Sequence, residues 1–223
     1  MKTSAISRLT TNRLSVYLRC LNRLDEAGVG KVSSRELADQ FQLNSAQIRK
    51  DLANFGEFGV RGVGYDVASL KRQIIAILGL DREYRIIIAG AGNLGTALAS
   101  YRSFNTGEFK IAALFDASAE RVKALKLAGF NAHPMGDLRR IVRKEKVDIA
   151  VLAVPGAAGQ AVLDQIATAG VRAVLNFVPM RLRVPDGVEL VTVDLKIQME
   201  SLAYRLACLL GRGRKSAPTA QGA

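Results

Sequence analysis

Residues 89–98, AGAGNLGTAL, decide the fold of the larger part of this 223-residue chain. Gly90, Gly92 and Gly95 have the G-x-G-x-x-G spacing, between the apolar run RIIIAG and a helical pattern. In such a turn the first glycine permits a sharp bend, the second lets a pyrophosphate approach the backbone, and the third lets helix and strand pack closely. The stretch therefore predicts a β-α-β unit that binds a dinucleotide at a helix N-terminus.

An acidic residue, Asp116, ends the next strand-like run, FKIAALFD. An acid at this place binds ribose hydroxyls and favours NAD(H) over NADP(H), whose 2′-phosphate it would repel. We expect the cofactor to be NADH or NAD⁺. The candidate cofactor-binding residues come from the glycine turn, the acid and the end of a later apolar strand: Gly90, Ala91, Gly92, Asn93, Leu94, Gly95, Asp116, Val154 and Pro155.

Apolar strand-like runs alternate with helical patterns throughout residues 81–194. This alternation predicts an α/β domain of the Rossmann type, with a doubly wound parallel sheet. Residues 195–210 read as an amphipathic helix with leucines and a methionine along one stripe. Residues 211–223 are basic and rich in small side chains, so we expect a disordered tail.

Residues 1–80 are predicted to form a winged helix-turn-helix domain. Ser33 and Glu36 have the spacing of a capping box before one short helix, and Asn44 is the expected cap of a second. The two helices are joined by QLN and follow a longer helix, which is the helix-turn-helix pattern. The glycine-rich residues 57–67 are interpreted as a β-hairpin, the wing.

The second short helix has the polar residues that a recognition helix needs near its N-terminal end. Ile48, Leu52 and Phe55 share one face, and basic or amide side chains lie opposite. In the wing, an arginine between glycines suits a narrow minor groove. The candidate DNA-binding residues are Ser45, Gln47, Arg49, Lys50, Arg61 and Gly62.

Composition narrows the class of protein only in part. A net charge of +12 and a pI of about 10.1 favour a polyanionic partner, although the basic excess is spread over the chain. No apolar run is long enough to span a bilayer, and no signal peptide is evident, so we expect a cytoplasmic protein without a membrane partner. Cys20 and Cys208 lie far apart and are expected to be buried thiols in a reducing compartment.

The catalytic groups of a dehydrogenase are missing from the sequence. The one histidine, His133, falls in the loop FNAHPMG, which is predicted at the far edge of the sheet. Tyr101 is predicted two turns along the helix after the glycines and has no evident lysine partner, and no cluster has metal-ligand spacing. The dinucleotide is therefore expected to be a signal rather than a reagent, and the protein not to be an enzyme.

The chain resembles the Rex family of redox-sensing transcriptional repressors over nearly its whole length. The resemblance rests on QIRKDLANFGEFGVRGVGYDV at 47–67, AGAGNLGTALASY at 89–101, AVLAVP at 150–155, VLNFVP at 174–179 and VTVDL at 191–195. It implies a homodimer that binds operator DNA with an inverted repeat and leaves it when NADH binds. Two alternatives remain open: a small NAD-dependent oxidoreductase, and a CoA-binding ligase subunit suggested by residues 154–177.

The resemblance also implies residue roles. Arg49, Lys50 and Arg61 would contact the operator, with Ser45 and Gln47 as weaker candidates. The helix over 195–210 would be exchanged between the two subunits. A switch between the cofactor and DNA domains would consist of Arg19, Tyr101 and Asp194. One departure is Leu195, since some relatives carry Phe beside that aspartate, near the nicotinamide.

Overall fold

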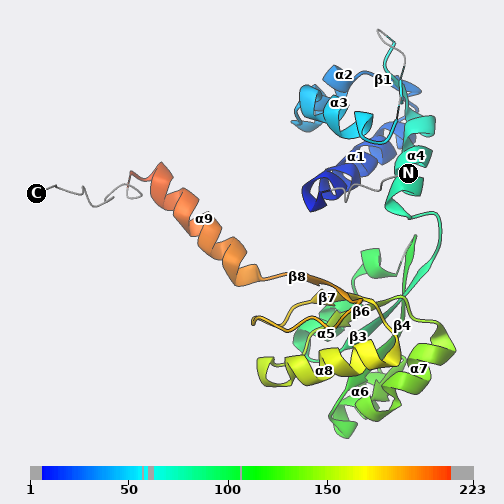
Figure 1. Cartoon of the computed structure of the whole chain (residues 1–223), viewed down its shortest axis with the longest axis vertical. Helices are drawn as coiled ribbons and strands as arrows, with labels where there is room; N and C mark the ends of the chain where they lie inside the picture. The colour runs from blue at the N-terminus through cyan, green and yellow to red at the C-terminus, as the bar shows by residue number, and fades with distance from the viewer. Residues whose placement is uncertain (1–6, 57, 60–62, 106, 212–223) are drawn as a thin grey trace, which may run out of the picture. The chain divides into compact units, whose positions relative to one another are not determined.

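The computed structural model of the chain describes residues 7–56, 58–59, 63–105 and 107–211 (Figure 1). The chain folds into two compact units, Met1–Glu83 and Tyr84–Ala223. The candidates Arg61 and Gly62 lie outside the described residues.

The first unit is built mainly of helices. Its elements are α1 (Arg8–Glu26), β1 (Lys31–Val32), α2 (Ser34–Phe41), α3 (Ser45–Ala53), β2 (Tyr65–Asp66) and α4 (Val67–Leu78). Ser33 and Glu36 form the expected capping box at α2, and the Asn44 side chain accepts a hydrogen bond from Gln47 N at the start of α3. Residues 42–44 connect α2 to α3, so the predicted helix-turn-helix is present in the structure.

One hydrophobic core holds these helices together. The largest buried side chains come from α1, α2, α3 and α4: Leu14, Leu21, Leu37, Ile48, Leu70 and Ile74. Packing of α1 against α4 closes the core around the helix-turn-helix. The recognition helix is thus fixed on a rigid base through its apolar face.

The hairpin predicted for residues 57–67 lies partly outside the described residues, since 57 and 60–62 are not described. In the described part of this segment, strand β2 pairs antiparallel with β1, a strand not expected from the sequence. Val32 of β1 is buried in the core, which anchors the pair. Gly64 lies so close to β1 that a Cβ there would be 2.6 Å from the Val32 carbonyl oxygen, at a φ of +90°. The position therefore requires glycine.

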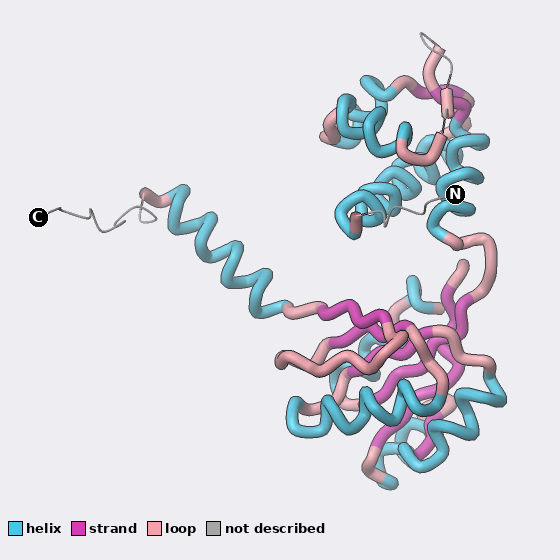
Figure 2. Tube along the Cα trace, viewed as in Figure 1, coloured by secondary structure: helices cyan, strands magenta, loops and turns pink. Residues whose placement is uncertain are grey.

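The second unit is a six-stranded parallel sheet with helices on both faces (Figure 2). Its elements are β3 (Tyr84–Ala89), α5 (Asn93–Ala99), η1 (Arg102–Phe104), β4 (Phe109–Asp116), α6 (Ala119–Leu127), β5 (Ala132–Pro134), η2 (Met135–Asp137), α7 (Leu138–Glu145), β6 (Ile149–Leu152), α8 (Gly156–Ala169), β7 (Ala173–Asn176), β8 (Glu189–Thr192) and α9 (Leu195–Leu209). The strand order is β5-β4-β3-β6-β7-β8. This is the doubly wound order of the Rossmann fold, so the predicted fold class is confirmed.

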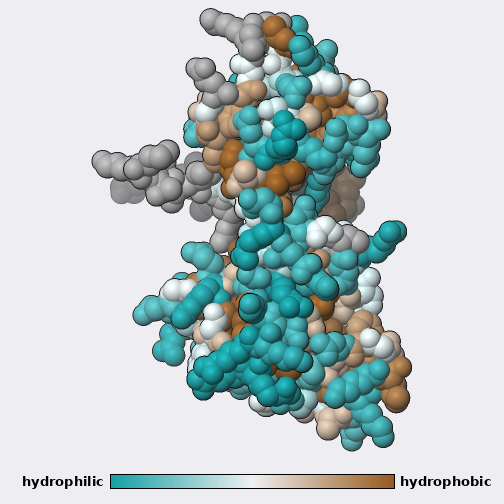
Figure 3. All heavy atoms as spheres, turned by 90° about the vertical axis from the view of Figure 1, so that its right-hand side faces the viewer, coloured by the Kyte–Doolittle hydropathy of each residue, from teal (hydrophilic) through white to brown (hydrophobic). Residues whose placement is uncertain are grey.

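Alternate residues of β3 serve the two faces of the sheet, as the pleat requires. Ile87 and Ala89 pack with residues of α7 and α8, whereas Ile86 and Ile88 pack with residues of α5 and α6. Because both faces are covered, β3 is apolar on both sides. The surface of this unit seen in Figure 3 is largely hydrophilic.

The helix after the glycine turn is shorter than expected. The sequence pattern predicted that this helix continues through Tyr101, but α5 ends at Ala99 and a short 3-10 turn, η1, follows. Tyr101 therefore lies beyond α5 rather than two turns along it. Asn105 holds the chain in this turn, because its side-chain amide donates to the Ala99 carbonyl.

Candidate functional site

A cavity of about 550 Å³ lies at the carboxyl ends of β3 and β6. These strands are neighbours in the sheet, and the chain winds outward in opposite directions from them. Ligands of open α/β sheets bind at this switch point. The cavity is lined by the glycine turn, the end of β4, the start of α6 and the first turns of α8: Gly90, Gly92, Asn93, Leu94, Asp116, Ala117, Ser118, Arg121, Met135, Ala153, Val154, Pro155, Ala158 and Val162.

The three glycines of the turn have different physical roles. Gly90 has a φ of +97°, and a Cβ there would be 2.4 Å from the Ala153 carbonyl oxygen across the switch point. A Cβ on Gly95 would be 1.9 Å from the Gly90 carbonyl oxygen, so Gly95 lets α5 pack onto the turn. A Cβ on Gly92 would meet nothing within 4 Å. Gly92 thus faces open space, where a ligand can approach the backbone.

Asp116 is fixed at the edge of this cavity by a set of hydrogen bonds. It is 6% exposed, and its carboxylate accepts from Ala91 N at 3.0 Å and from Ser118 N at 2.9 Å. The guanidinium of Arg121, in the first turn of α6, lies 3.3 Å from Asp116 Oδ2. The carboxylate therefore ties the glycine turn to the end of β4.

Most of the predicted cofactor residues are brought together by the fold. Gly90, Gly92, Asn93, Leu94, Asp116, Val154 and Pro155 all line the cavity. The other two do not. Ala91 is buried and contributes its backbone amide to Asp116, and Gly95 contributes close packing.

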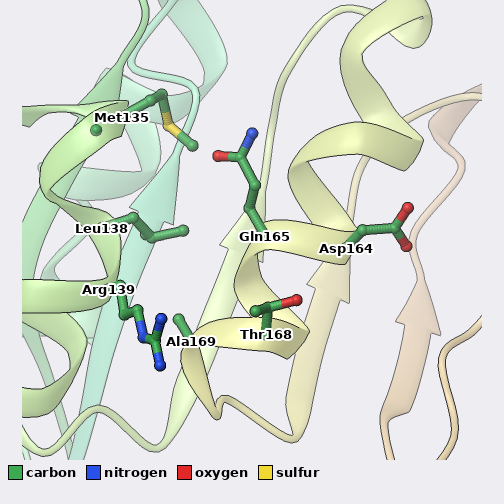
Figure 4. Close-up of a pocket in the computed structure, with 8 residues that line it drawn as sticks. Met135, Leu138, Arg139, Asp164, Gln165, Thr168 and Ala169 are labelled. Atoms are coloured by element: carbon green, nitrogen blue, oxygen red, sulfur yellow. The ribbon is translucent and has the colours of Figure 1, made fainter.

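Sequence reasoning missed seven residues of the cavity wall: Ala117, Ser118, Arg121, Met135, Ala153, Ala158 and Val162. Arg121 could have been found, because it lies in the first helical turn after Asp116 and points back to it. Met135 carries no such signal, since its place depends on β5 lying next to β4. Met135 also lines a neighbouring groove of about 570 Å³ between α7 and α8, together with Leu138 and Gln165 (Figure 4).

The predicted DNA-contacting residues of α3 lie as expected from the helical phase. Ile48 and Leu52 are buried, Arg49 and Lys50 are exposed, and Ser45 is half-buried. Arg49 Nη1 donates to Ser34 Oγ at 2.9 Å, which links α3 to the start of α2. The polar face of α3 is thus free of the core, as a recognition helix requires.

A buried charge network under α3 was not predicted from the sequence. Asp51 is 1% exposed and accepts hydrogen bonds from Arg13 Nε at 2.5 Å, Arg13 Nη2 at 2.7 Å and Tyr17 Oη at 2.8 Å. The Arg13 guanidinium holds the pKa of the Asp51 carboxyl below its usual value, and burial raises the pKa of Tyr17. The network locks α3 against α1. Periodicity gave no signal, because an aspartate one residue before Leu52 reads as a surface position.

Asp51→Ala is expected to destabilise the first unit by about 3 kcal/mol, because the Arg13 charge would lose its buried partner. Folding lowers the pKa of Asp51, so the stabilisation by its carboxylate is complete above the pKa of the unfolded state, near pH 4. This stabilisation is lost as the pH falls through the pKa of the folded state. Thermal unfolding followed by circular dichroism from about pH 7 down to about pH 3 tests both statements.

The matched control is Asp25→Ala, which removes the exposed ion pair between Asp25 and Lys71. Its cost should stay below about 1 kcal/mol. Equal costs for the two variants would show that the buried network adds nothing beyond a surface pair.

The three predicted switch residues lie in different parts of the chain. Arg19 is an exposed residue of α1 in the first unit. Tyr101 is 57% exposed and packs edge-on against Phe104, with ring centroids 5.6 Å apart. Asp194 is the N-cap of α9, where it accepts from Lys196 N and Ile197 N. Their joint action stays a prediction.

Other groups singled out in the sequence have structural roles. His133 is on β5, the edge strand, where its Nε2 lies 2.8 Å from Asn131 Oδ1 and its ring packs on Phe115. Burial lowers the pKa of His133. Cys20 is buried as expected, whereas Cys208 is exposed on α9, which corrects the expectation of two buried thiols.

Two kinds of feature are absent from the part of the chain that the structure describes. Within residues 7–56, 58–59, 63–105 and 107–211, no helix has both the length and the apolar character needed to cross a membrane. Over the same described ranges, His, Cys, Asp and Glu side chains form no group of three or more that could hold a metal ion.

Comparison with known proteins gives matches over both units. Residues 5–53 match a family model described as "Putative DNA-binding protein N-terminus", and residues 81–180 match one described as "CoA binding domain". The redox-sensing transcriptional repressors Rex of Desulforamulus reducens and Syntrophomonas wolfei are 43% and 45% identical to this chain, each over 93% of it and 98% of the relative.

Solved structures extend this likeness to three dimensions. The crystal structure of RSP in complex with β-NAD⁺ and operator DNA matches with a TM-score of 0.86 at 37% identity, covering 93% of this chain and 95% of that one. RSP, described as a Rex-family repressor, also matches in its complex with β-NADH, with a TM-score of 0.81 at 34% identity over 95% of this chain and all of that one.

A helix-turn-helix unit and a Rossmann sheet with a cavity at its switch point, in one chain with these relatives, define a transcription regulator rather than an enzyme. The chain belongs to the Rex family of redox-sensing transcriptional repressors. The oxidoreductase and CoA-ligase alternatives are therefore set aside, and the match to the CoA-binding model covers residues 81–180 only.

Proposed function

We propose that this chain binds operator DNA through α3 and is released from it when NADH fills the cavity at the switch point. The observation that carries the proposal is the cavity, which both Gly92 and Asp116 line. The same chain also has a recognition helix, α3. Residues 1–80 would be the DNA-binding domain and residues 81–194 the NAD(H)-binding domain of a cytoplasmic repressor.

In the DNA domain, Arg49 and Lys50 are the exposed cations of the recognition helix. Arg49 suits a guanine edge because its guanidinium forks, whereas Lys50 neutralises phosphate as a point charge. Ser45 and Gln47 lie nearer the N-terminus of α3, the end that contacts base edges. Arg61 and Gly62 would add the contacts of the wing.

In the second domain, the cofactor would lie across the carboxyl ends of β3 and β6. Its pyrophosphate would pass over Gly92, where the backbone is open. Asp116 would bind the adenosine ribose, and Met135, Val154 and Ala158 would surround the adenine with apolar surface. RSP was crystallised with β-NAD⁺ and with β-NADH, which supports both redox forms as ligands.

We propose further that the protein is a homodimer, with α9 (within residues 195–210) as its exchanged helix. Five large apolar side chains of α9 share one stripe and are more than half exposed: Leu195, Met199, Leu202, Leu206 and Leu209. Ile197 and Tyr204 lie on the opposite side and are also exposed. A helix that is apolar on two opposite faces is normally buried on both, as in a helix inserted between two surfaces.

The signal must come from a difference in affinity between two states of the dimer. A ligand with equal affinity for both states would shift nothing, however tightly it binds. NADH and NAD⁺ differ by one positive charge and by ring planarity at the nicotinamide. We assign the sensing of this charge difference to Asp194, because a carboxylate discriminates strongly between a neutral and a cationic ring. Tyr101 and Arg19 would act together with Asp194.

Fluorescence anisotropy of a labelled inverted-repeat duplex tests the function. Titration with NADH should release the protein, and NAD⁺ at the same concentration should release less of it. Asp194→Ala should weaken the response to NADH while NADH still binds. Saturating NADH that leaves operator affinity unchanged would rule out the sensing role.

A further inference from the structure

The side-chain amide of Gln47 is held in one orientation by a buried carboxylate. Gln47 Nε2 lies 2.8 Å from Asp51 Oδ1, one helical turn further along α3. An ionised carboxylate only accepts hydrogen bonds, so the amide must turn its NH₂ group toward Asp51 and its carbonyl oxygen away. In the alternative orientation, the partially negative Gln47 Oε1 would face the negatively charged Asp51 Oδ1.

Asp51 is itself immobile, because its oxygens are fully used. Oδ1 accepts from Arg13 Nη2 and Gln47 Nε2, and Oδ2 accepts from Arg13 Nε and Tyr17 Oη. These four bonds match the roughly four acceptor positions of a carboxylate. Since Asp51 is 1% exposed, a partner lost from this network would not be replaced freely by water.

The carbonyl oxygen of the Gln47 side chain points away from the buried network. Among the described residues, none donates a hydrogen bond to Gln47 Oε1. This oxygen is also not one of the buried polar atoms that lack a hydrogen-bond partner. Gln47 lies in the first turn of α3, two residues after Ser45. This end of a recognition helix reaches base edges in the major groove.

We propose that Asp51 positions Gln47 to read an exocyclic amino group in the major groove, that of adenine or cytosine, and to reject guanine and thymine. This inference rests on the proposed DNA-binding function. Guanine O6 and N7 and thymine O4 only accept hydrogen bonds, so these bases offer no donor to the outward-facing Oε1, and their oxygens would repel it. Adenine suits the site best, because N6 donates to Oε1 while N7 accepts the second Nε2 hydrogen.

Selection from a duplex library with randomised inverted half-sites tests the proposal. The wild-type protein should require an amino-bearing base at one position of each half-site, by about 5- to 150-fold over guanine or thymine. Gln47→Ala should lose this preference at that position and keep the others. Asp51→Asn should admit guanine or thymine there, because an asparagine amide can also donate to Gln47 Oε1.

Two results would overturn the proposal: a uniform loss of affinity over all sequences for Gln47→Ala, or an unchanged preference in folded Asp51→Asn. If Asp51→Asn does not fold, NMR of the wild-type protein decides instead. The Gln47 side-chain amide, assigned by its absence in Gln47→Ala, should show shifts and slow exchange unlike those of a free glutamine, and free-amide behaviour contradicts the proposal. If the wild-type protein selects no inverted repeat from the library, the proposed DNA-binding function is refuted. The NMR signal of the Gln47 side-chain amide still shows in that case whether Asp51 orients it.

Discussion

Gly95→Ala is expected to weaken NADH binding about 100-fold while the first unit stays folded. The new Cβ would lie 1.9 Å from the Gly90 carbonyl oxygen, and both atoms belong to the backbone of the glycine turn. No flexible side chain can move aside, so α5 must shift away from β3 and carry Asn93 and Leu94 with it. We expect a loss of about 3 kcal/mol at this site, which corresponds to an affinity for NADH that is about 100-fold weaker.

Gly92→Ala is the matched comparison, because it adds the same methyl group three residues earlier. Nothing lies within 4 Å of that Cβ, so the protein without ligand should keep the melting temperature of the wild type. The methyl group would instead occupy the path of the pyrophosphate and weaken NADH binding. Thermal unfolding and NADH fluorescence titration of both variants separate the two roles. Equal melting temperatures for the two variants would show that Gly95 has no packing role.

The sequence was sufficient to predict the second unit because its signals are local. The G-x-G-x-x-G turn, the apolar strands and Asp116 follow one another along the chain, and the handedness of β-α-β connections then places them at one sheet edge. Seven of the nine predicted cofactor residues line one cavity for this reason. Met135 was missed because its position depends on the pairing of β4 with β5.

The first unit contains features that could not be predicted from the sequence alone. Its helices have caps and apolar faces that are legible in the sequence, such as Ser33 with Glu36. The pairing of β1 with β2 joins residues more than thirty positions apart and involves two short strands, for which periodicity carries no information. The Asp51 network likewise joins α3 to Arg13 and Tyr17 of α1. Such a buried charge becomes visible only when the two helices are packed together.

The double variant Leu202→Glu/Leu206→Glu is expected to convert the proposed dimer into monomers. Both leucines belong to one apolar stripe of α9 and are more than half exposed in the single chain. Burying a leucine contributes about 1.5–3 kcal/mol. In a symmetric dimer each substitution is present in both subunits, so its effect occurs twice. The four lost contacts shift dimerisation by about 6 kcal/mol or more, which is about four decades in the dissociation constant. Sedimentation equilibrium measures this directly.

Operator binding should be lost together with dimerisation, because an inverted repeat is bound tightly only by two linked recognition helices. Glutamate is a good helix former, so the variant should retain α9 and separate the loss of contacts from the loss of the helix. Glu200→Gln is the control: Glu200 lies on the polar flank of α9, 3.8 Å from Lys196, and its substitution should leave the dimer and the operator affinity unchanged. A double variant that remains dimeric would exclude α9 as the subunit interface, since burial of the stripe could not tolerate four unpaired carboxylates.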